Sequence, residues 1–221
     1  MPRRKSIDYQ TFKARYKSMH VAANYETYRF FSLVGRWRNA TKTLALRRAF
    51  SRIGSPGLVL DVPCGTGRFF KLFESIGARY AGCDISHEMI LHAREKSGPG
   101  ASAGFAVGDA EALPFRDASA AVVLSVRFLH QLPCDVRVRI LREMARVAKE
   151  FVIVDYRFTL SVRNVFRIVA AAARIKPPFE RRSTRRAMRE ELAHAGLEPV
   201  AVIPVVPFFS DKYVVVCRRA K

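Results

Sequence analysis

The stretch LVLDVPCGTGRFF, which runs from Leu58 to Phe70, decides the fold of this chain. Its first five residues, Leu58–Val62, form a short and largely apolar run that is typical of a strand buried on both faces of a sheet. Gly65 and Gly67 follow in a loop, where they let the backbone turn tightly and let a ligand approach without a Cβ in the way. A helical pattern follows over 68–76. A loop between the first strand and a helix is the usual ligand crevice of parallel α/β sheets, so the stretch also predicts a binding site.

The glycine spacing argues against one class of ligand. A dinucleotide-binding fingerprint would place a third glycine at position 70, where it allows close packing of the helix on the strand. This chain has Phe70 at that position. We therefore do not expect a nicotinamide or flavin dinucleotide in this loop, although it keeps the form of a site for a nucleotide-like ligand.

Strand-like and helix-like segments alternate after the glycine loop. Apolar or β-branched segments predict further strands at residues 78–83, 105–107, 120–125 and 151–155. Helical patterns lie between them, one from the predicted N-cap Ser86 to about Lys96 and one over 135–148. This alternation predicts βαβ units and a parallel sheet.

The alternation stops after Asp155. Helices are predicted over 159–176 and from Ser183 or Thr184 to about Ala195, with Gly196 as the closing glycine. A short connection separates two last strands, at 200–205 and 213–217, so we expect them to be antiparallel. The predicted fold class is α/β, with a Rossmann-like, doubly wound, seven-stranded and mostly parallel sheet whose last strand is antiparallel.

The turn sequence GSPG at 54–57 separates two parts of different composition. Residues 1–53 contain no good strand candidate, and helical patterns at 7–19 and 27–52 predict a basic N-terminal helical lid or cap. Residues 54–221 form the predicted ligand-binding domain, with a basic helical insertion at about 158–182.

Positive charge is concentrated outside the predicted sheet. The 221 residues carry a net charge of +20, to which residues 1–52 contribute +11, residues 157–191 contribute +7 and residues 53–156 contribute nothing. Solvated helix faces often carry such charge, but the neutral middle favours a basic surface for an anionic partner. The candidate partners are an acidic small molecule, an anionic lipid or membrane surface and, ranked third, RNA.

The composition also indicates where in the cell the protein is located. No apolar run approaches the roughly 20 residues that cross a bilayer. The basic start has no apolar stretch behind it, so no secretory signal is expected. The four cysteines show no metal-ligand spacing, and neither a metal nor a disulfide is predicted. We expect a cytoplasmic protein, with a peripheral location at the inner face of the membrane left open.

The glycine loop resembles motif I of the class I S-adenosylmethionine (SAM)-dependent methyltransferases. That motif has an acidic residue after three hydrophobic ones, followed by a C/G-G-x-G loop. In the family, the loop wraps the methionyl part of the cofactor and the acid orients it. The resemblance implies cofactor-binding roles for Asp61, Cys64, Gly65 and Gly67.

Two further acids stand where this family binds the rest of SAM. Asp84, in YAGCDIS, follows Gly67 by 17 residues, and the resemblance implies that it accepts both ribose hydroxyls. Asp109, in GDAEALPF, is implied to accept from the adenine amino group, and Ala110 to offer a backbone N–H to the ring. The implied cofactor site is completed by Ile85 and Val126.

The run LSVRFLHQLP at 124–133 resembles the subfamily of ubiquinone and menaquinone C-methyltransferases, the methyltransferase type 11 group. His130 matches a histidine of that subfamily and is a candidate general base, because imidazole titrates near neutrality. The alternative that His130 packs under the cofactor loop stays open. Tyr156 is a second catalytic candidate. The candidates for contact with the methyl acceptor are Tyr28, Arg157 and Arg127, the last of which departs from the small or amide residue of the pattern.

The implied activity is in-line transfer of a methyl group from SAM to oxygen or carbon of an anionic small-molecule or lipid-linked acceptor. Two alternatives stay open, namely RNA methylation through the basic flanks and a SAM-binding regulatory protein without catalysis. The resemblance covers about residues 55–157. Residues 1–50 and 158–182, the regions that choose substrates in this family, match no pattern that we can name, so the sequence does not identify the acceptor.

Overall fold

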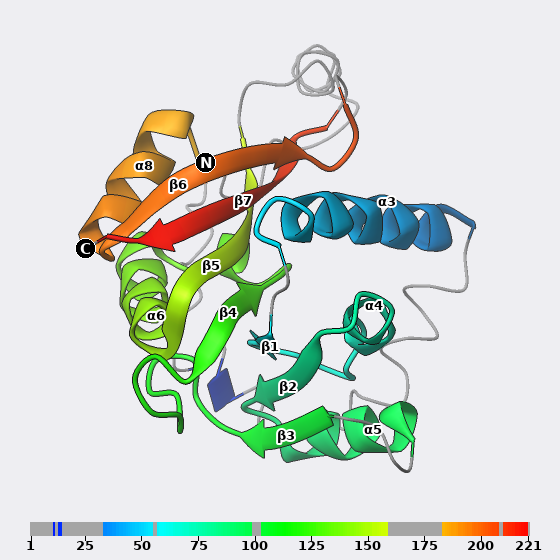
Figure 1. Cartoon of the computed structure of the whole chain (residues 1–221). Helices are drawn as coiled ribbons and strands as arrows, with labels where there is room; N and C mark the ends of the chain where they lie inside the picture. Colours follow the sequence, from blue (N-terminus) through cyan, green and yellow to red (C-terminus); the bar gives the residue numbers. More distant parts are fainter. Residues whose placement is uncertain are drawn as a thin grey trace.

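The sheet is the centre of the structure (Figure 1). A computed structural model describes residues 11, 13–14, 33–54, 57–98, 103–158, 183–207 and 210–220. Most of the helix expected at 7–19, all of that at 159–176 and nearly all of the insertion at 158–182 lie outside these residues. The predicted lid is therefore described mainly through residues 33–53.

The described elements agree closely with the predicted ones. The strands are β1 (Leu58–Asp61), β2 (Arg79–Asp84), β3 (Ala103–Val107), β4 (Ala120–Ser125), β5 (Ala148–Arg157), β6 (Leu197–Pro204) and β7 (Lys212–Arg219). The helices are α3 (Leu33–Phe50), α4 (Phe70–Glu74), α5 (His87–Ser97), the 3₁₀ turn η1 (Leu129–Gln131), α6 (Cys134–Val147) and α8 (Arg185–His194).

The strand order is β3-β2-β1-β4-β5-β7-β6. The pairs from β3 to β5 are parallel, whereas β7 runs antiparallel to both β5 and β6. The order reverses between β1 and β4, which is the point where such sheets open a crevice beyond the carboxyl ends of their strands. The doubly wound sheet and its antiparallel last strand are confirmed.

Alternate residues of each central strand pack on opposite faces of the sheet, because strand side chains alternate in direction. Val59, Val122 and Ile153 belong to the core beneath α3 and α4. The neighbouring residues Leu60 and Val123 belong to the core beneath α6 and α8. The helices on the two faces are visible in Figure 1.

Two helix starts follow the predicted capping chemistry. The Ser86 hydroxyl accepts from the Met89 N–H at the start of α5, and the Thr184 hydroxyl accepts from the Ala187 N–H at the start of α8. The helix expected over 68–76 is shorter, because successive turns extend the glycine loop to residue 69 before α4 begins. β5 is longer than expected, because it pairs with β7 as far as Arg157.

Candidate functional site

An open cavity lies at the point where the strand order reverses. Its volume, counted together with the adjoining space open to solvent, is about 1090 Å³. All but one of the predicted cofactor residues line it, namely Asp61, Cys64, Gly65, Asp84, Ile85, Asp109, Ala110 and Val126. Arg127, predicted to contact the acceptor, lines it as well.

The remaining predicted residue, Gly67, does not line the cavity but packs against α5. Its φ of 67° is a left-handed conformation that favours glycine, and a Cβ there would lie 3.2 Å from the Cβ of Ala93 in α5. Gly67 therefore allows α5 to pack against the loop. Gly65 also has a positive φ, of 54°, but faces open space within the cavity wall. The space in front of Gly65 leaves its backbone accessible to a ligand.

The Asp84 carboxylate is fixed by two backbone groups. Its Oδ2 accepts from the Gly65 N–H at 2.9 Å, and its Oδ1 accepts from the Ser86 N–H at 2.9 Å. Burial raises the pKa of Asp84, although these N–H groups favour the ionised form. Each carboxylate oxygen can accept a second hydrogen bond, so Asp84 keeps acceptor capacity toward the cavity.

Asp61 is buried at the end of β1, with 2% of its surface exposed. The Tyr80 hydroxyl donates to its Oδ2 at 3.0 Å. Burial raises the pKa of Asp61 to about 7, against the opposing effects of Tyr80 and Arg68. A cationic ligand group beside this carboxylate would stabilise its ionised form.

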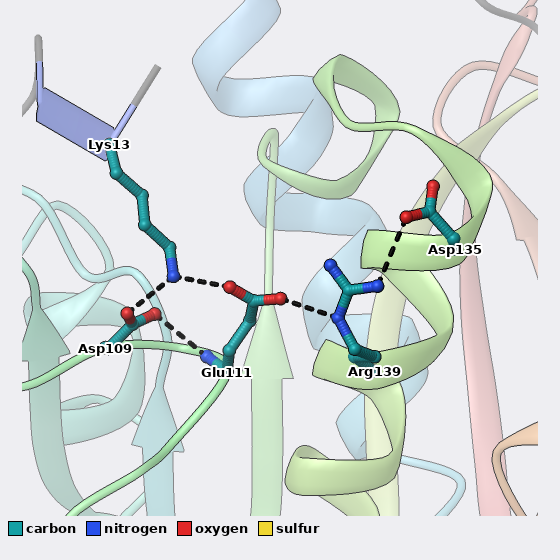
Figure 2. Close-up of polar contacts among 5 residues, drawn as sticks. All are labelled: Lys13, Asp109, Glu111, Asp135 and Arg139. Carbon is teal, nitrogen blue, oxygen red and sulfur yellow. Dashed lines mark hydrogen bonds and ion pairs between the residues drawn. The ribbon is translucent and has the colours of Figure 1, made fainter. Parts of the chain in front are cut away.

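Lys13 reaches the cavity from the N-terminal part of the chain (Figure 2). Its Nζ lies 2.6 Å from Oδ2 of Asp109 and also forms an ion pair with Glu111. Glu111 accepts from Arg139 of α6 at 2.8 Å, and Arg139 donates to Asp135 at 3.1 Å. This chain of contacts connects Lys13 with α6. Nothing in the sequence singles out Lys13.

Arg68 is a second cavity residue that the sequence analysis missed. Its Nε donates to Oδ1 of Asn39 in α3 at 2.6 Å, and its guanidinium lies over the Phe69 ring. Arg68 also acts electrostatically on Asp61, so it stands at the same end of the cavity. The available signal was its position directly after the glycine loop.

Arg127 has a strained backbone at the end of β4. Its φ is 65°, which is unusual for a residue other than glycine. The Arg127 N–H donates to Oδ1 of Asp155 at 2.7 Å, and its carbonyl accepts from the Gln131 side chain at 2.8 Å. Oδ2 of Asp155 lies 2.8 Å from Nζ of Lys42. The buried Asp155 thus holds both α3 and the loop that carries Arg127.

The two catalytic candidates lie outside the cofactor cavity wall. His130, Tyr156 and Arg157 line a smaller neighbouring pocket, together with Asp155. The Tyr156 hydroxyl donates to Glu191 of α8 at 3.0 Å, and its ring is buried. The acceptor candidate Tyr28 lies outside the described residues.

The described residues contain neither a metal-binding cluster nor a membrane-spanning helix. No group of histidine, cysteine and carboxylate side chains there is arranged to hold a metal ion. No helix in the same ranges has both the length and the apolar character needed to cross a membrane.

Comparison with known proteins identifies the domain that carries the cavity. A family model described as "Methyltransferase domain" matches residues 59–150. The demethylmenaquinone methyltransferase of Thermobifida fusca is 37% identical over 118 residues, which are 51% of this chain and 45% of that protein. Residues 59–150 thus match a methyltransferase domain, in agreement with the resemblance to the class I SAM-dependent methyltransferases. The matched stretch contains Asp61, Gly65, Asp84 and Asp109 of the methyltransferase cavity.

A second relative differs in its acceptor. The malonyl-[acyl-carrier protein] O-methyltransferase of Erwinia pyrifoliae is 38% identical over 102 residues, which are 45% of this chain and 36% of that protein. The chain thus spans less than half the length of either relative. The resemblance to quinone methyltransferases is confirmed by the first relative, whereas the matches leave the methyl acceptor undefined.

A solved structure extends the likeness to the whole fold. The magnesium protoporphyrin IX methyltransferase of Synechocystis PCC 6803, with bound S-adenosylhomocysteine (SAH), superimposes with a TM-score of 0.70 over 96% of this chain and 100% of that one. At 15% sequence identity, this likeness concerns the fold alone.

The methyltransferase cavity fits SAM, the cofactor of this family. Asp61 offers a buried carboxylate that an ammonium group would stabilise, and Gly65 leaves its backbone accessible. Asp84 presents an oriented carboxylate for two hydroxyls. The residues present therefore match the ammonium group and the two ribose hydroxyls of the cofactor.

Proposed function

We propose that this chain methylates oxygen or carbon of an anionic small-molecule or lipid-linked acceptor, using SAM. The observation that carries the proposal is the row of three carboxylates, Asp61, Asp84 and Asp109, in a cavity that also contains Arg127. The same cavity thus contains carboxylates suited to the cofactor and, near the end of β4, an arginine suited to an anionic acceptor.

The three carboxylates would each hold a different part of the cofactor. Asp61 would bind the amino group of the methionyl part, Asp84 the ribose hydroxyls and Asp109 the adenine amino group. When bound, SAM supplies a methyl group activated by a positively charged sulfur. Methyl transfer needs alignment more than charge stabilisation, so the main task of these residues is to fix position.

The smaller pocket supports the choice of acceptor-side residues. Arg127 lines the cofactor cavity and Arg157 lines the smaller pocket, so an acidic acceptor between the two pockets would contact both arginines. His130 is our candidate for removing a proton from an oxygen nucleophile, and Tyr156 is the second candidate. The Tyr156 hydroxyl would first have to leave Glu191.

The net charge of +20 supports a proposal about location. A cytoplasmic enzyme with basic flanks could collect a lipid-linked acceptor at an anionic membrane surface. Flotation with vesicles containing anionic lipid would test it, and reversal of Arg163, Arg167 and Arg174, which lie outside the described residues, should weaken the binding. Unchanged flotation would contradict the membrane proposal.

The activity itself is tested in two steps. Calorimetry should first detect binding of SAM and SAH, and failure of both to bind would overturn the proposal. Methyl-labelled SAM is then incubated with the protein and with an acidic metabolite fraction, a lipid extract or tRNA. Label in an acidic metabolite or lipid supports the proposal. Label in tRNA alone, or binding without any transfer, would contradict it.

A further inference from the structure

Four basic side chains gather where α3 meets the end of β5 and the start of β7. Nζ of Lys42 is 2.8 Å from Oδ2 of Asp155, and Arg38 precedes Lys42 by one helical turn. Arg157 and Lys212 stand opposite each other in the antiparallel β5–β7 pair. Arg157 follows Asp155 by two residues, so it and its partner point toward α3 as well. We call these four basic residues the cationic cluster.

Among the described residues, the four cations of the cationic cluster outnumber the two carboxylates that act on them. One nearby carboxylate is already paired with Lys42, and a second belongs to Asp211. No carboxylate of the described residues forms an ion pair with Lys212. Burial and the charges of Arg38, Arg157 and Lys42 lower the pKa of Lys212 to about 8, against the effect of Asp211. An anion bound there would relieve this repulsion.

The cationic cluster adjoins both pockets of the methyltransferase domain. Asp155, which pairs with Lys42, accepts from the N–H of Arg127 at 2.7 Å, and Arg127 lines the cofactor cavity. Asp155 and Arg157 also line the smaller pocket. The cluster therefore lies at the carboxyl ends of β4 and β5, on the side of the cavity away from Asp84 and Asp109.

We propose that the cationic cluster binds the acidic group of the methyl acceptor, a carboxylate or a phosphate. This inference rests on the proposed function and specifies its acceptor site. Lys42 is buried, Arg157 and Lys212 are half-buried and only Arg38 is exposed, so the cluster suits one small acidic group better than the extended phosphate row of a nucleic acid. The guanidinium of Arg157 suits paired oxygens, and the two lysines supply point charges.

The test is calorimetric titration of the full chain with inorganic phosphate and with acetate at constant ionic strength, with and without saturating SAH. We expect saturable binding of at least one of these anions in both states. Lys212→Gln should weaken that binding by more than about tenfold, whereas Lys212→Arg, which keeps the charge, should retain most of it. Lys149→Gln is the matched control, because Lys149 is an exposed lysine at the opposite end of β5.

Thermal unfolding separates loss of the site from loss of the fold. Lys212→Gln should unfold at the same or a higher temperature than the native chain, because it removes a crowded positive charge. Absence of saturable anion binding by the native chain, or equal binding by Lys212→Gln, would overturn the proposal. Loss of SAH binding would instead contradict the proposed function, since the phosphate titration without SAH still reports on the cluster.

Discussion

Nζ of Lys13 lies 2.6 Å from Oδ2 of Asp109, across a separation of 96 residues. Oδ1 of the same carboxylate accepts from the Glu111 N–H at 3.0 Å. Both oxygens of the expected adenine acceptor are thus engaged in the described structure (Figure 2). Each oxygen can still accept a second hydrogen bond, so we expect Lys13 to compete with the adenine amino group for Oδ2 of Asp109 without excluding it.

Replacing Lys13 with methionine should tighten cofactor binding, because it frees one oxygen of Asp109 and removes a positive charge from the cavity. The ion pair is partly exposed, so the gain should be between about twofold and fivefold. Calorimetry should show a larger gain for SAM, which carries an extra positive charge, than for SAH. Lys149→Met is the control, and weaker binding by Lys13→Met would mean that Lys13 holds the cofactor instead.

Binding of SAH should depend on pH through Asp61. Burial raises the pKa of this carboxyl to about 7, so it is largely protonated below that pH in the free protein. A bound ammonium group favours the ionised form, and binding therefore releases a proton at low pH. The affinity for SAH should rise about tenfold between about pH 6 and pH 8 and then level off.

Two comparisons check the assignment to Asp61. 5′-Methylthioadenosine lacks the amino-acid part, so its affinity should change much less over the same range. Asp61→Asn should flatten the SAH profile and weaken binding at the upper end. A steep profile that persists in Asp61→Asn would assign the proton to another group.

Arg68 should select for the amino-acid end of the cofactor. Asn39 orients its guanidinium beside the Asp61 end of the cavity, where the cofactor carboxylate needs a cation. Arg68→Gln should weaken SAH binding by about tenfold or more and leave 5′-methylthioadenosine binding nearly unchanged. Equal losses for both ligands in calorimetry would show that Arg68 supports the loop and does not contact the carboxylate.

The buried ion pair between Arg137 and Glu191 should dominate stability where α6 meets α8. Nε of Arg137 donates to Oε2 of Glu191 at 3.2 Å, and Tyr156 donates to the same oxygen. Arg137→Met leaves a buried carboxylate without its cation and should lower the free energy of unfolding by about 3–5 kcal/mol. Urea denaturation measures the loss.

The control variants for this pair separate charge from packing. Arg189→Met removes an exposed arginine of α8 and should change stability by less than about 0.5 kcal/mol. Combining Arg137→Met with Glu191→Met should recover much of the loss, because no unpaired charge remains buried. A double variant as unstable as Arg137→Met alone would contradict the electrostatic explanation.

The sequence predicted what depends on local patterns. Apolar strands, the caps at Ser86 and Thr184 and the glycine loop are short-range features, and all appear in the structure. Side-chain pairing across the fold was not predictable. A lysine within a basic helix is normally exposed, so nothing in residues 33–50 indicated that Lys42 is buried against Asp155.

Among the residues that line the cavity, too, those in local patterns were predicted and those placed by long-range contacts were not. The family pattern led to Asp61, Asp84 and Asp109, because their spacing along the chain is fixed by successive βα units. Lys13 was missed because its contact spans nearly half the chain. Arg68 was missed although it lies within the stretch Leu58–Phe70. The family pattern specifies only the acid and the glycines of this stretch, and it assigns no role to the residue after Gly67.

Through Asp155, α3 is tied to the loop that carries Arg127, so the helix is more than a removable cap. A chain shortened to begin at residue 54 would leave this carboxylate without Lys42, and it would uncover the apolar surface that Leu46 and Phe50 now bury. The strained turn at Arg127 would then depend on a buried anion lacking its counter-charge. Asp155 is thus the single side chain that links Lys42 of α3 to the backbone of Arg127 at the cavity.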